Sequence, residues 1–550
     1  MQNPPHTGLR SRLPGAGIVF LAAILASLVL AGCGGTSYRF AEADPVTRED
    51  DTRPIPSPEE ADYRKLLETG TALVRRPAKE GLSLSGSIPA LDVNSMDDVP
   101  ASTWFEPRLG YGDLTPEQLL SGPQEIGPPE HPITVTRAKF GGGNPGFIIR
   151  DGREHLYLVK FDPPEFPAIE TTTALIVNRM FWGFGYNVPE DYLFQFTEEE
   201  LGVEAEGELT REDVAAVLSR VAPPVDGRYR STVSLLLKGG ILGPVPATGV
   251  RKDDPNDRIP HEKRRALRAM KMFAAFTNHS DMRIDNSLDV YEGEPGEGYV
   301  RHYLLDFGEA FGGHGAEHDY LWDGFHHMFS FSDAFKNLFT LGLRVEDWEN
   351  IEYTRWRSVG AFEAAAFKPG SWKEVTPYAP MRNSQPGDDY WAGKILAALT
   401  PEHIETLVRA ADYPEEGAAD YVLVTLLERR RKVLEFAMNG VSPLEPVGLS
   451  NAELRVRDVG LEILGVDSKG TSYEIEYFDD SGNAVGGRQV IQSSGAEFAV
   501  AVPAQLLAKA AGYLRVDIRV SRKGKRSPAA AQFHVRQGLD ASPLLVGVVH

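Results

Sequence analysis

Alternating apolar and polar positions predict a β-rich segment in the first half of the chain. ITVTRAKF (133–140) and HLYLVKF (155–161) alternate like strands, and a glycine-rich turn and the run FIIRD lie between them. Apolar residues in 169–182 recur at helical spacing, and strands are predicted again at 192–196 and 229–237. The predicted order is strand, glycine loop, strand, turn, strand, helix and two more strands.

Helical spacing dominates after about residue 240. In 261–277, alanine, methionine and phenylalanine side chains fall on one face, which predicts a helix. Further helical patterns follow at 331–340, 357–367, 389–399, 401–412 and 417–438. We therefore expect a helical half after the β-rich half, with a cleft between the two.

A third pattern begins near residue 445. Short alternating stretches at 472–478, 497–503, 513–521 and 531–535 are separated by turns. Strands of this length and spacing predict a small all-β sandwich of immunoglobulin-like size over 445–537.

Together these patterns predict an α+β fold with more than one core, which a chain of 550 residues is long enough to build. The predicted parts begin with a signal segment at 1–32 and a region at 33–82 that holds a solvated tether, which has few apolar residues, and a short helix near 58–76. A mixed body at 83–440 follows, with a β-rich lobe near 130–240 and a helical lobe near 241–440, and then the sandwich.

The charge balance limits the classes of partner. The formal net charge is -21, which argues against non-specific binding to nucleic acid or to an anionic membrane surface. We therefore expect no nucleic-acid partner.

The N-terminus has the form of an export signal. Arg10 and Arg12 precede an uncharged apolar run, Gly17 to Leu30, and small residues follow it. Leu-Ala-Gly-Cys ending at Cys33 resembles the bacterial lipobox, in which the cysteine becomes the lipidated first residue, and Cys33 is the only cysteine. This resemblance implies a lipid-anchored protein of the bacterial cell envelope, with the outer membrane or periplasmic face favoured. The alternative is a plain signal anchor with an incidental cysteine.

Three polar residues stand out because they follow or interrupt apolar sequence. Asp281 and Asn286 lie in NHSDMRIDNSL, and Asp306 lies in YVRHYLLDFGEAFG. An unpaired carboxylate or amide is costly in such surroundings, which indicates a purpose such as phosphate and metal chemistry. The motifs Asp-x-x-x-x-Asn and Asp-Phe-Gly are each common by themselves. Their occurrence together in this order, after a glycine loop and a Val-Lys-Phe strand, is far less common.

These motifs resemble those of the protein-kinase-like superfamily, in the style of its HipA-like and secreted spore-coat-type branches. Asp281 to Asn286 has the catalytic-loop spacing D-x-x-x-x-N, His279-Ser280-Asp281 stands where kinases have His-Arg-Asp, and Asp306-Phe307-Gly308 matches the metal-binding Asp-Phe-Gly. The resemblance covers about 130–440 and implies a two-lobed kinase-like fold.

The resemblance also implies roles for particular residues. Asp281 would be the catalytic base, with Arg283 placed to contact the γ-phosphate, and Asn286 and Asp306 would hold Mg²⁺ or Mn²⁺. The cofactor would be ATP or a related nucleotide. Its phosphates would be bound by Lys160, by Glu170 as the partner of that lysine, and by the glycine loop, namely Gly141, Gly142, Gly143 and Gly146.

Several departures from the kinase pattern bear on function. Ser280 replaces the usual arginine, the glycine loop reads GGGNPG, Lys160 and Glu170 are close in sequence, and no Ala-Pro-Glu follows the Asp-Phe-Gly. The expected function is an exported, membrane-tethered phosphotransferase with an unknown acceptor. Two alternatives stay open: a non-catalytic envelope lipoprotein, which a compartment poor in ATP favours, and an AMP transferase using the same site.

Overall fold

The structure is a computed structural model, which describes residues 39–61, 88–139, 144–205, 207–314, 317–318, 320–328 and 345–550. The proposed lipidation residue Cys33, the loop glycines Gly141, Gly142 and Gly143, the helix predicted at 331–340 and most of the short helix predicted near 58–76 lie outside these residues. Within the described part, no helix is both long and apolar enough to cross a membrane.

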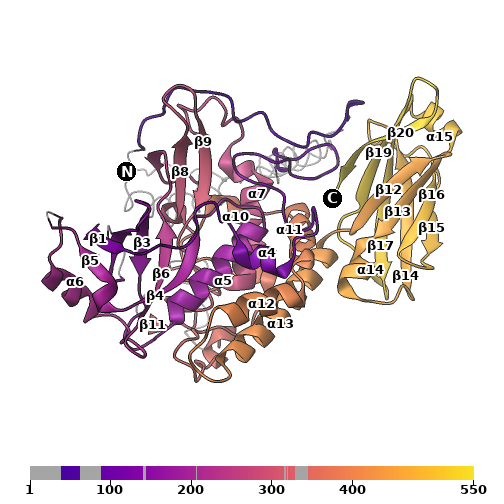
Figure 1. Cartoon of the computed structure of the whole chain (residues 1–550). Coiled ribbons are helices and arrows are strands. Elements are labelled where there is room, and N and C mark those ends of the chain that lie inside the picture. Colours follow the sequence, from indigo (N-terminus) through magenta and orange to yellow (C-terminus); the bar gives the residue numbers. More distant parts are fainter. Residues whose placement is uncertain are drawn as a thin grey trace, which may run out of the picture.

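The β-rich half is a twisted sheet with the strand order β4-β6-β3-β2-β1-β5 (Figure 1). Neighbouring strands are antiparallel except for β5, which pairs with β1 in parallel. The strands are β1 (Ile133–Ala138), β2 (Gly146–Arg150), β3 (Leu156–Lys160), β4 (Asp191–Phe196), β5 (Leu201–Val203) and β6 (Tyr229–Leu235). All the strands predicted in this half are present, and β5 and α6 (Arg211–Leu218) occupy the segment between β4 and β6.

Helix α5 (Ile169–Gly183) confirms the helix predicted at 169–182. Asp162, which is 1% exposed, accepts hydrogen bonds from the backbone N–H groups of Glu170 (2.8 Å) and Thr171 (2.9 Å). It also accepts from the Thr171 hydroxyl (2.7 Å). The carboxylate satisfies donors that the start of a helix leaves unpaired, and so fixes the turn that carries Glu170.

Replacing Asp162 by alanine is expected to lower the free energy of unfolding by about 1–3 kcal/mol, because buried N–H groups lose their acceptor. Urea-induced unfolding followed by circular dichroism measures this change. Glu212→Ala removes an exposed acidic residue from the first turn of α6 and serves as the control, with a change within about 0.5 kcal/mol. An Asp162→Ala protein as stable as the wild type would refute the capping role.

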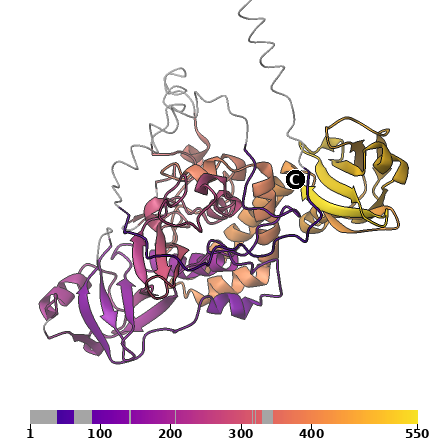
Figure 2. The same ribbon diagram turned by 90° about the horizontal axis from the view of Figure 1, so that it is seen from above.

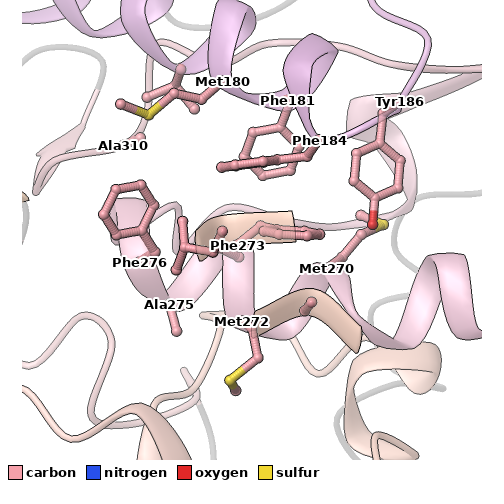
Figure 3. Close-up of a cluster of buried hydrophobic side chains, with 14 of the residues drawn as sticks. Met180, Phe181, Phe184, Tyr186, Met270, Met272, Phe273, Ala275, Phe276 and Ala310 are labelled. Carbon is pink, nitrogen blue, oxygen red and sulfur yellow. The ribbon is translucent and has the colours of Figure 1, made fainter. Parts of the chain in front are cut away.

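The central core joins the two halves of the body. Figure 3 shows side chains of α5 meeting those of α8 (Met270–Thr277), and the rings of Phe184 and Phe273 stack with centroids 4.2 Å apart. Helices α11 (Pro386–Ala398), α12 (Pro401–Ala410) and α13 (Ala418–Gly440) contribute to the same core and confirm the last three helical predictions. Because α8 leads directly into the predicted catalytic loop, this core sets the position of that loop relative to α5.

The prediction of a single helix over 261–277 is wrong. The chain forms the 3-10 turn η3 (His261–Lys263), the short helix α7 (Arg265–Arg268) and α8. Arg264 takes an extended conformation, with its guanidinium 3.4 Å from Asp257 and 4.8 Å from the ring centroid of Trp104. Pairing this buried charge competes with helix formation and interrupts it.

The helix predicted at 357–367 is also wrong, because this stretch consists of turns and bends. Ala361 N–H donates to the carbonyl of Gly312 (2.8 Å), and Gly360 lies so close to Gly312 that a Cβ would clash. Phe362 and Phe367 are buried beneath the guanidinium of Arg429, which lies 4.9 and 3.7 Å from their ring centroids. Tertiary contacts therefore override the helical spacing here.

A three-stranded antiparallel sheet interrupts the predicted helical half. It contains β7 (Gly240–Gly243), β8 (Ser287–Glu292) and β9 (Tyr299–Leu304) in that order. Strand β7 follows β6 after four residues, and β8 and β9 flank the connector between Asn286 and Asp306. This small sheet therefore brings the two predicted metal ligands to one edge.

The C-terminal region is all-β apart from two short helices, and its two sheets share one hydrophobic core (Figure 1). Its elements are β12 (Leu444–Ser450), β13 (Glu453–Asp458), α14 (Val459–Leu464), β14 (Thr471–Phe478), β15 (Gln489–Gln492), β16 (Glu497–Ala501), α15 (Ala504–Lys509), β17 (Tyr513–Arg522), β18 (Lys525–Arg526), β19 (Ala531–Gln537) and β20 (Pro543–Val549). Strand β20 extends the region beyond the predicted end at 537, and the immunoglobulin-like assignment stays a prediction.

Residues 39–61 form an extended strap along the surface where a solvated tether was predicted. Figure 2 shows this indigo segment crossing from the C-terminal β region along the body toward the sheet of β1–β6. The strap hydrogen-bonds to the body along its length: Glu49 N–H donates to Ala101 O (2.8 Å), Ile55 N–H to Gly298 O (2.9 Å) and Ala61 N–H to Leu242 O (2.9 Å).

Candidate active site

The loop after α8 is held by its own backbone and by neighbouring side chains. Asn278 ends α8 in the left-handed conformation (φ 48°), and its Oδ1 accepts from Trp372 Nε1 (3.0 Å). Val375 N–H donates to Ser280 O (2.9 Å). The Nδ1 atom of buried His279 lies 2.9 Å from the carbonyl oxygen of Glu309 and links this loop to the segment after Asp-Phe-Gly.

Asp281 and Asn286 meet as their spacing predicts. Asn286 Nδ2 donates to the backbone carbonyl and to Oδ2 of Asp281, both at 2.8 Å. Arg283 lies between two acidic side chains, with Nη1 3.0 Å from Asp281 Oδ1 and Nε 3.0 Å from Asp285 Oδ1. Asp281 is 7% exposed, so these contacts hold its carboxyl group in one orientation inside the protein.

Glu309 is a second acidic residue beside Asp281, and sequence reasoning missed it. Burial, together with the charge and hydrogen bond of Glu309, raises the pKa of Asp281, while Arg283 opposes the shift. Two carboxyl groups that lie close enough to share a hydrogen bond favour a proton or a cation between them. The position directly after Asp-Phe-Gly is the signal that could have identified Glu309.

Lys160 and Asp306 form the bond that joins the β-rich half to the second half of the site. Lys160 Nζ lies 2.6 Å from Asp306 Oδ1, across 146 residues of sequence. Desolvation by the surrounding protein disfavours both charges, although the Asp306 side chain is still 44% exposed. Each charge stabilises the other, so the pKa of Asp306 is lowered and the pKa of Lys160 is raised. Asp306 has φ 59°, a backbone conformation that is uncommon for residues with a side chain and that clusters at functional sites.

Glu170, predicted as the partner of Lys160, instead accepts a hydrogen bond from the side chain of Asn144 in the glycine loop. Its carboxylate also lies against Gly308, where an added Cβ would be 3.4 Å from Oε2. Burial raises the pKa of Glu170 to about 8, opposed by the hydrogen bond from Asn144. Lys160 lies close enough for its charge to act on Glu170, but Asp306 is the residue that it contacts.

A cavity of about 660 Å³ lies between the first sheet and the three-stranded sheet. Lys160, Asn286 and Asp306 line one part of it. The remaining lining includes the apolar side chains of Leu156, Leu158, Ile241, Leu288 and Leu305 and the segment 235–238 that joins β6 to β7. It also includes several polar or charged side chains: Arg137, Lys139, Glu154, His155, Ser234 and Asp285. A cavity of this size that combines apolar walls with converging charged groups can hold a small molecule that has an apolar part and a charged part. Asp281, Glu170 and Gly146 are not part of its lining and lie beside it.

Lys139, which sequence reasoning missed, is a second cation at this site. Its side chain lines the cavity and packs against Gly146, and its Nζ donates to the backbone carbonyl of Asn144 (3.0 Å). Burial and the charge of Lys160 lower the pKa of Lys139. Two lysines at one end of a cavity in a strongly acidic protein suit a polyanion. Gly146 permits this arrangement because a side chain there would also clash with the carbonyl of Val159.

Lys139→Met is expected to weaken binding of ATP and ADP and to leave binding of adenosine unchanged. A lost charge-assisted hydrogen bond costs about 1.5–3 kcal/mol, which corresponds to roughly a 10- to 100-fold rise in Kd. Titration calorimetry with the three ligands measures the difference, and Lys252→Met, at an exposed position, is the control. An equal loss for adenosine and ATP would show that Lys139 does not act on the phosphates.

The residues at the site fit a hard divalent cation. Asn286 directs Nδ2 to Asp281, which leaves Oδ1 as an acceptor, and Asp306 uses Oδ1 for Lys160, which leaves Oδ2. Amide and carboxylate oxygens are ligands that Mg²⁺ prefers. In the described part of the chain, no group of three or more His, Cys, Asp or Glu is placed to hold a metal. Mg²⁺ is commonly bound by only one or two protein side chains, with water and substrate oxygens as its other ligands.

Comparison with known proteins gives structural likeness only. No protein-family model matches the chain, and no curated protein matches it. Among solved structures, it resembles the Helicobacter pylori proinflammatory kinase CtkA (13% identity, TM-score 0.29, covering 55% of this chain and 95% of that chain). It also resembles the Golgi casein kinase, including a structure with Mn/ADP bound (9% identity, TM-score 0.31, covering 70% of this chain and 94% of that chain).

These neighbours are kinases, and the chain has a mixed α+β structure with a β-rich sheet region and helices. The chemistry of the site follows from the geometry of this chain's own residues, above all from the contact between Lys160 and Asp306.

Proposed function

We propose that this protein is an exported, membrane-tethered phosphotransferase of protein-kinase-like architecture that uses a nucleotide with Mg²⁺ or Mn²⁺. The observation that carries the proposal is the contact between Lys160 and Asp306 at the cavity that Asn286 also lines. A strand lysine, an Asp-Phe-Gly aspartate and a catalytic-loop asparagine have separate roles in phosphoryl transfer, and here they converge on one space large enough for a small molecule.

Each side chain has a defined task in the proposed reaction. Lys160 and Lys139 bind phosphate oxygens, and Asn286 and Asp306 would hold the metal, which would offset the charge of the phosphates. The acceptor hydroxyl oxygen bonds to the γ-phosphorus, the bond from that phosphorus to the bridging oxygen breaks, and the nucleoside diphosphate leaves. Asp281 orients the hydroxyl and takes its proton. Glu170 and His279 hold the surrounding loops in place through Asn144 and Glu309.

The first experiment incubates the chain from Cys33 onward with ATP labelled at the α- or γ-phosphate, with Mg²⁺, with Mn²⁺ and without metal. We expect the γ-phosphate label to appear on an acceptor or on the protein itself, and only when a metal is present. The labelling should be strongly reduced in Lys160→Met. A gain of AMP in the product mass would instead support an AMP transferase. Metal-dependent ATP binding without transfer would support the non-catalytic alternative, and no ATP binding would refute the proposal.

A further inference from the structure

The strap begins at one particular end of the C-terminal β region. Phe40 N–H donates to the hydroxyl of Tyr513 (2.8 Å), and its ring lies 4.9 Å from that of His534. Gly547 makes room for this ring, because an added Cβ would lie 2.3 Å from it. Arg39 lies 3.8 Å from Asp480 in the turn after β14. The chain is therefore fixed to the β region from its first described residues.

The two ends of the β region have different surroundings. At one end, His550 follows β20 and packs on the body, with its ring nitrogens 2.8 Å from Asp97 Oδ2 and 2.9 Å from Leu444 O. The strand register places Phe478 opposite Arg515, and Gln537 opposite Pro543, at the other end. We name this other end, which carries the turns 479–483, 510–512 and 538–542, the turn end.

The turn end carries Arg39 and an exposed apolar residue. Leu539, in the turn between β19 and β20, has a fully exposed side chain (105%). Arg39 follows Cys33 by six positions, a span of about 22 Å at full extension. A lipid attached to Cys33 therefore restricts how far the turn end can lie from the bilayer.

The strap connects the turn end with the opposite side of the molecule. From Phe40 it passes the body, where Thr103 N–H donates to Asp51 Oδ2 (2.7 Å) and Tyr291 Oη donates to Ile55 O (2.8 Å), and it reaches β7 beside the cavity. Figure 2 shows the sheet of β1–β6 and the C-terminal β region at opposite ends of the molecule. A lipid anchor next to the turn end therefore leaves the sheet of β1–β6 far from the bilayer.

We propose that the strap and a lipid anchor at Cys33 hold the turn end of the C-terminal β region against the bilayer, with Leu539 at the contact and the sheet of β1–β6 directed away from it. The partner of this surface is the lipid bilayer itself. This orientation rests on the lipid anchor proposed above and is independent of whether the site transfers phosphate. It leaves the nucleotide cavity and its acceptor side open to the space beyond the membrane surface.

Energy transfer from single dyes to the bilayer tests this orientation. Lipidation consumes the thiol of Cys33, the only cysteine, so Ser481→Cys in the turn end and Ser219→Cys beyond α6 each supply one labelling site at an exposed serine. The lipidated protein is bound to zwitterionic phosphatidylethanolamine–phosphatidylcholine vesicles that carry a headgroup-linked acceptor dye. We expect transfer several-fold greater from position 481 than from position 219, and Phe40→Ala should bring the ratio toward one.

Equal transfer from the two positions, or a ratio that Phe40→Ala leaves unchanged, would overturn the orientation. Val490→Ala, at an exposed position of β15, is the matched control for Phe40→Ala and should preserve the ratio. Protein that does not float with the vesicles would refute the anchor, and with it the orientation. The labelled-ATP experiment does not depend on this result. The proposed membrane orientation and the proposed phosphate transfer can therefore be refuted independently of each other.

Discussion

Asp306→Ala is expected to abolish metal-dependent nucleotide binding. The substitution removes one of the two proposed oxygen ligands and leaves the Lys160 ammonium without its carboxylate partner at 2.6 Å. Metal–oxygen interactions at such a site contribute several kcal/mol, so we expect the affinity for Mg-ATP to fall by roughly two orders of magnitude. The residual binding should no longer strengthen when Mg²⁺ is added.

Titration calorimetry with and without Mg²⁺ measures this effect, and circular dichroism checks that the variant is folded. Asp226→Ala, in an exposed turn, removes an aspartate that also has a positive φ (50°) and is the matched control. If Asp306→Ala bound Mg-ATP as tightly as the wild type, the assignment of Asp306 as a metal ligand would be wrong.

Asp281→Asn is expected to separate catalysis from binding. The amide has nearly the same shape, and its oxygen can still accept a hydrogen bond from Asn286 or from Arg283, but it cannot accept a proton. General-base catalysis contributes about 10²- to 10⁴-fold, so the rate of phosphate transfer should fall by that factor. The Kd for Mg-ATP should stay within about threefold of the wild-type value, because Asp281 lies outside the cavity lining.

Single-turnover transfer of labelled phosphate measures the rate, and calorimetry measures the Kd on the same preparation. Asp226→Asn is the control, since asparagine tolerates the positive φ of that exposed turn. Two results would count against the role given to Asp281: unchanged transfer, or a loss of nucleotide binding as large as the loss of transfer.

The part of the site that sequence predicted best is local in the chain. Asp281 and Asn286 are five residues apart in one loop, so their spacing alone brings the side chains together. The contact between Lys160 and Asp306 spans 146 residues, and the resemblance to kinases assigned both residues to one nucleotide–metal site but named Glu170 as the partner of Lys160. Lys139 and Glu309 belong to no motif, and their proximity to the site follows from the path of β1 and of the segment after Gly308.

The errors in the fold have a common physical origin. Helical spacing depends only on which side chains are apolar. In 261–277 it does not take account of the buried partner of Arg264, and in 357–367 it does not take account of the backbone contact between Gly312 and Ala361. The strap was predicted as a solvated tether because it has few apolar residues. Its backbone groups, which composition does not describe, provide many of its contacts with the body.

The most direct test of the nucleotide–metal cavity is a calorimetric titration of ATP into the wild-type chain from Cys33 onward, with and without Mg²⁺. The convergence of Lys160, Asn286 and Asp306 on one cavity predicts saturable binding of one ATP per chain that is at least tenfold tighter with Mg²⁺, about 1.4 kcal/mol or more. An absence of binding under both conditions would contradict the account, as would an affinity that Mg²⁺ does not change.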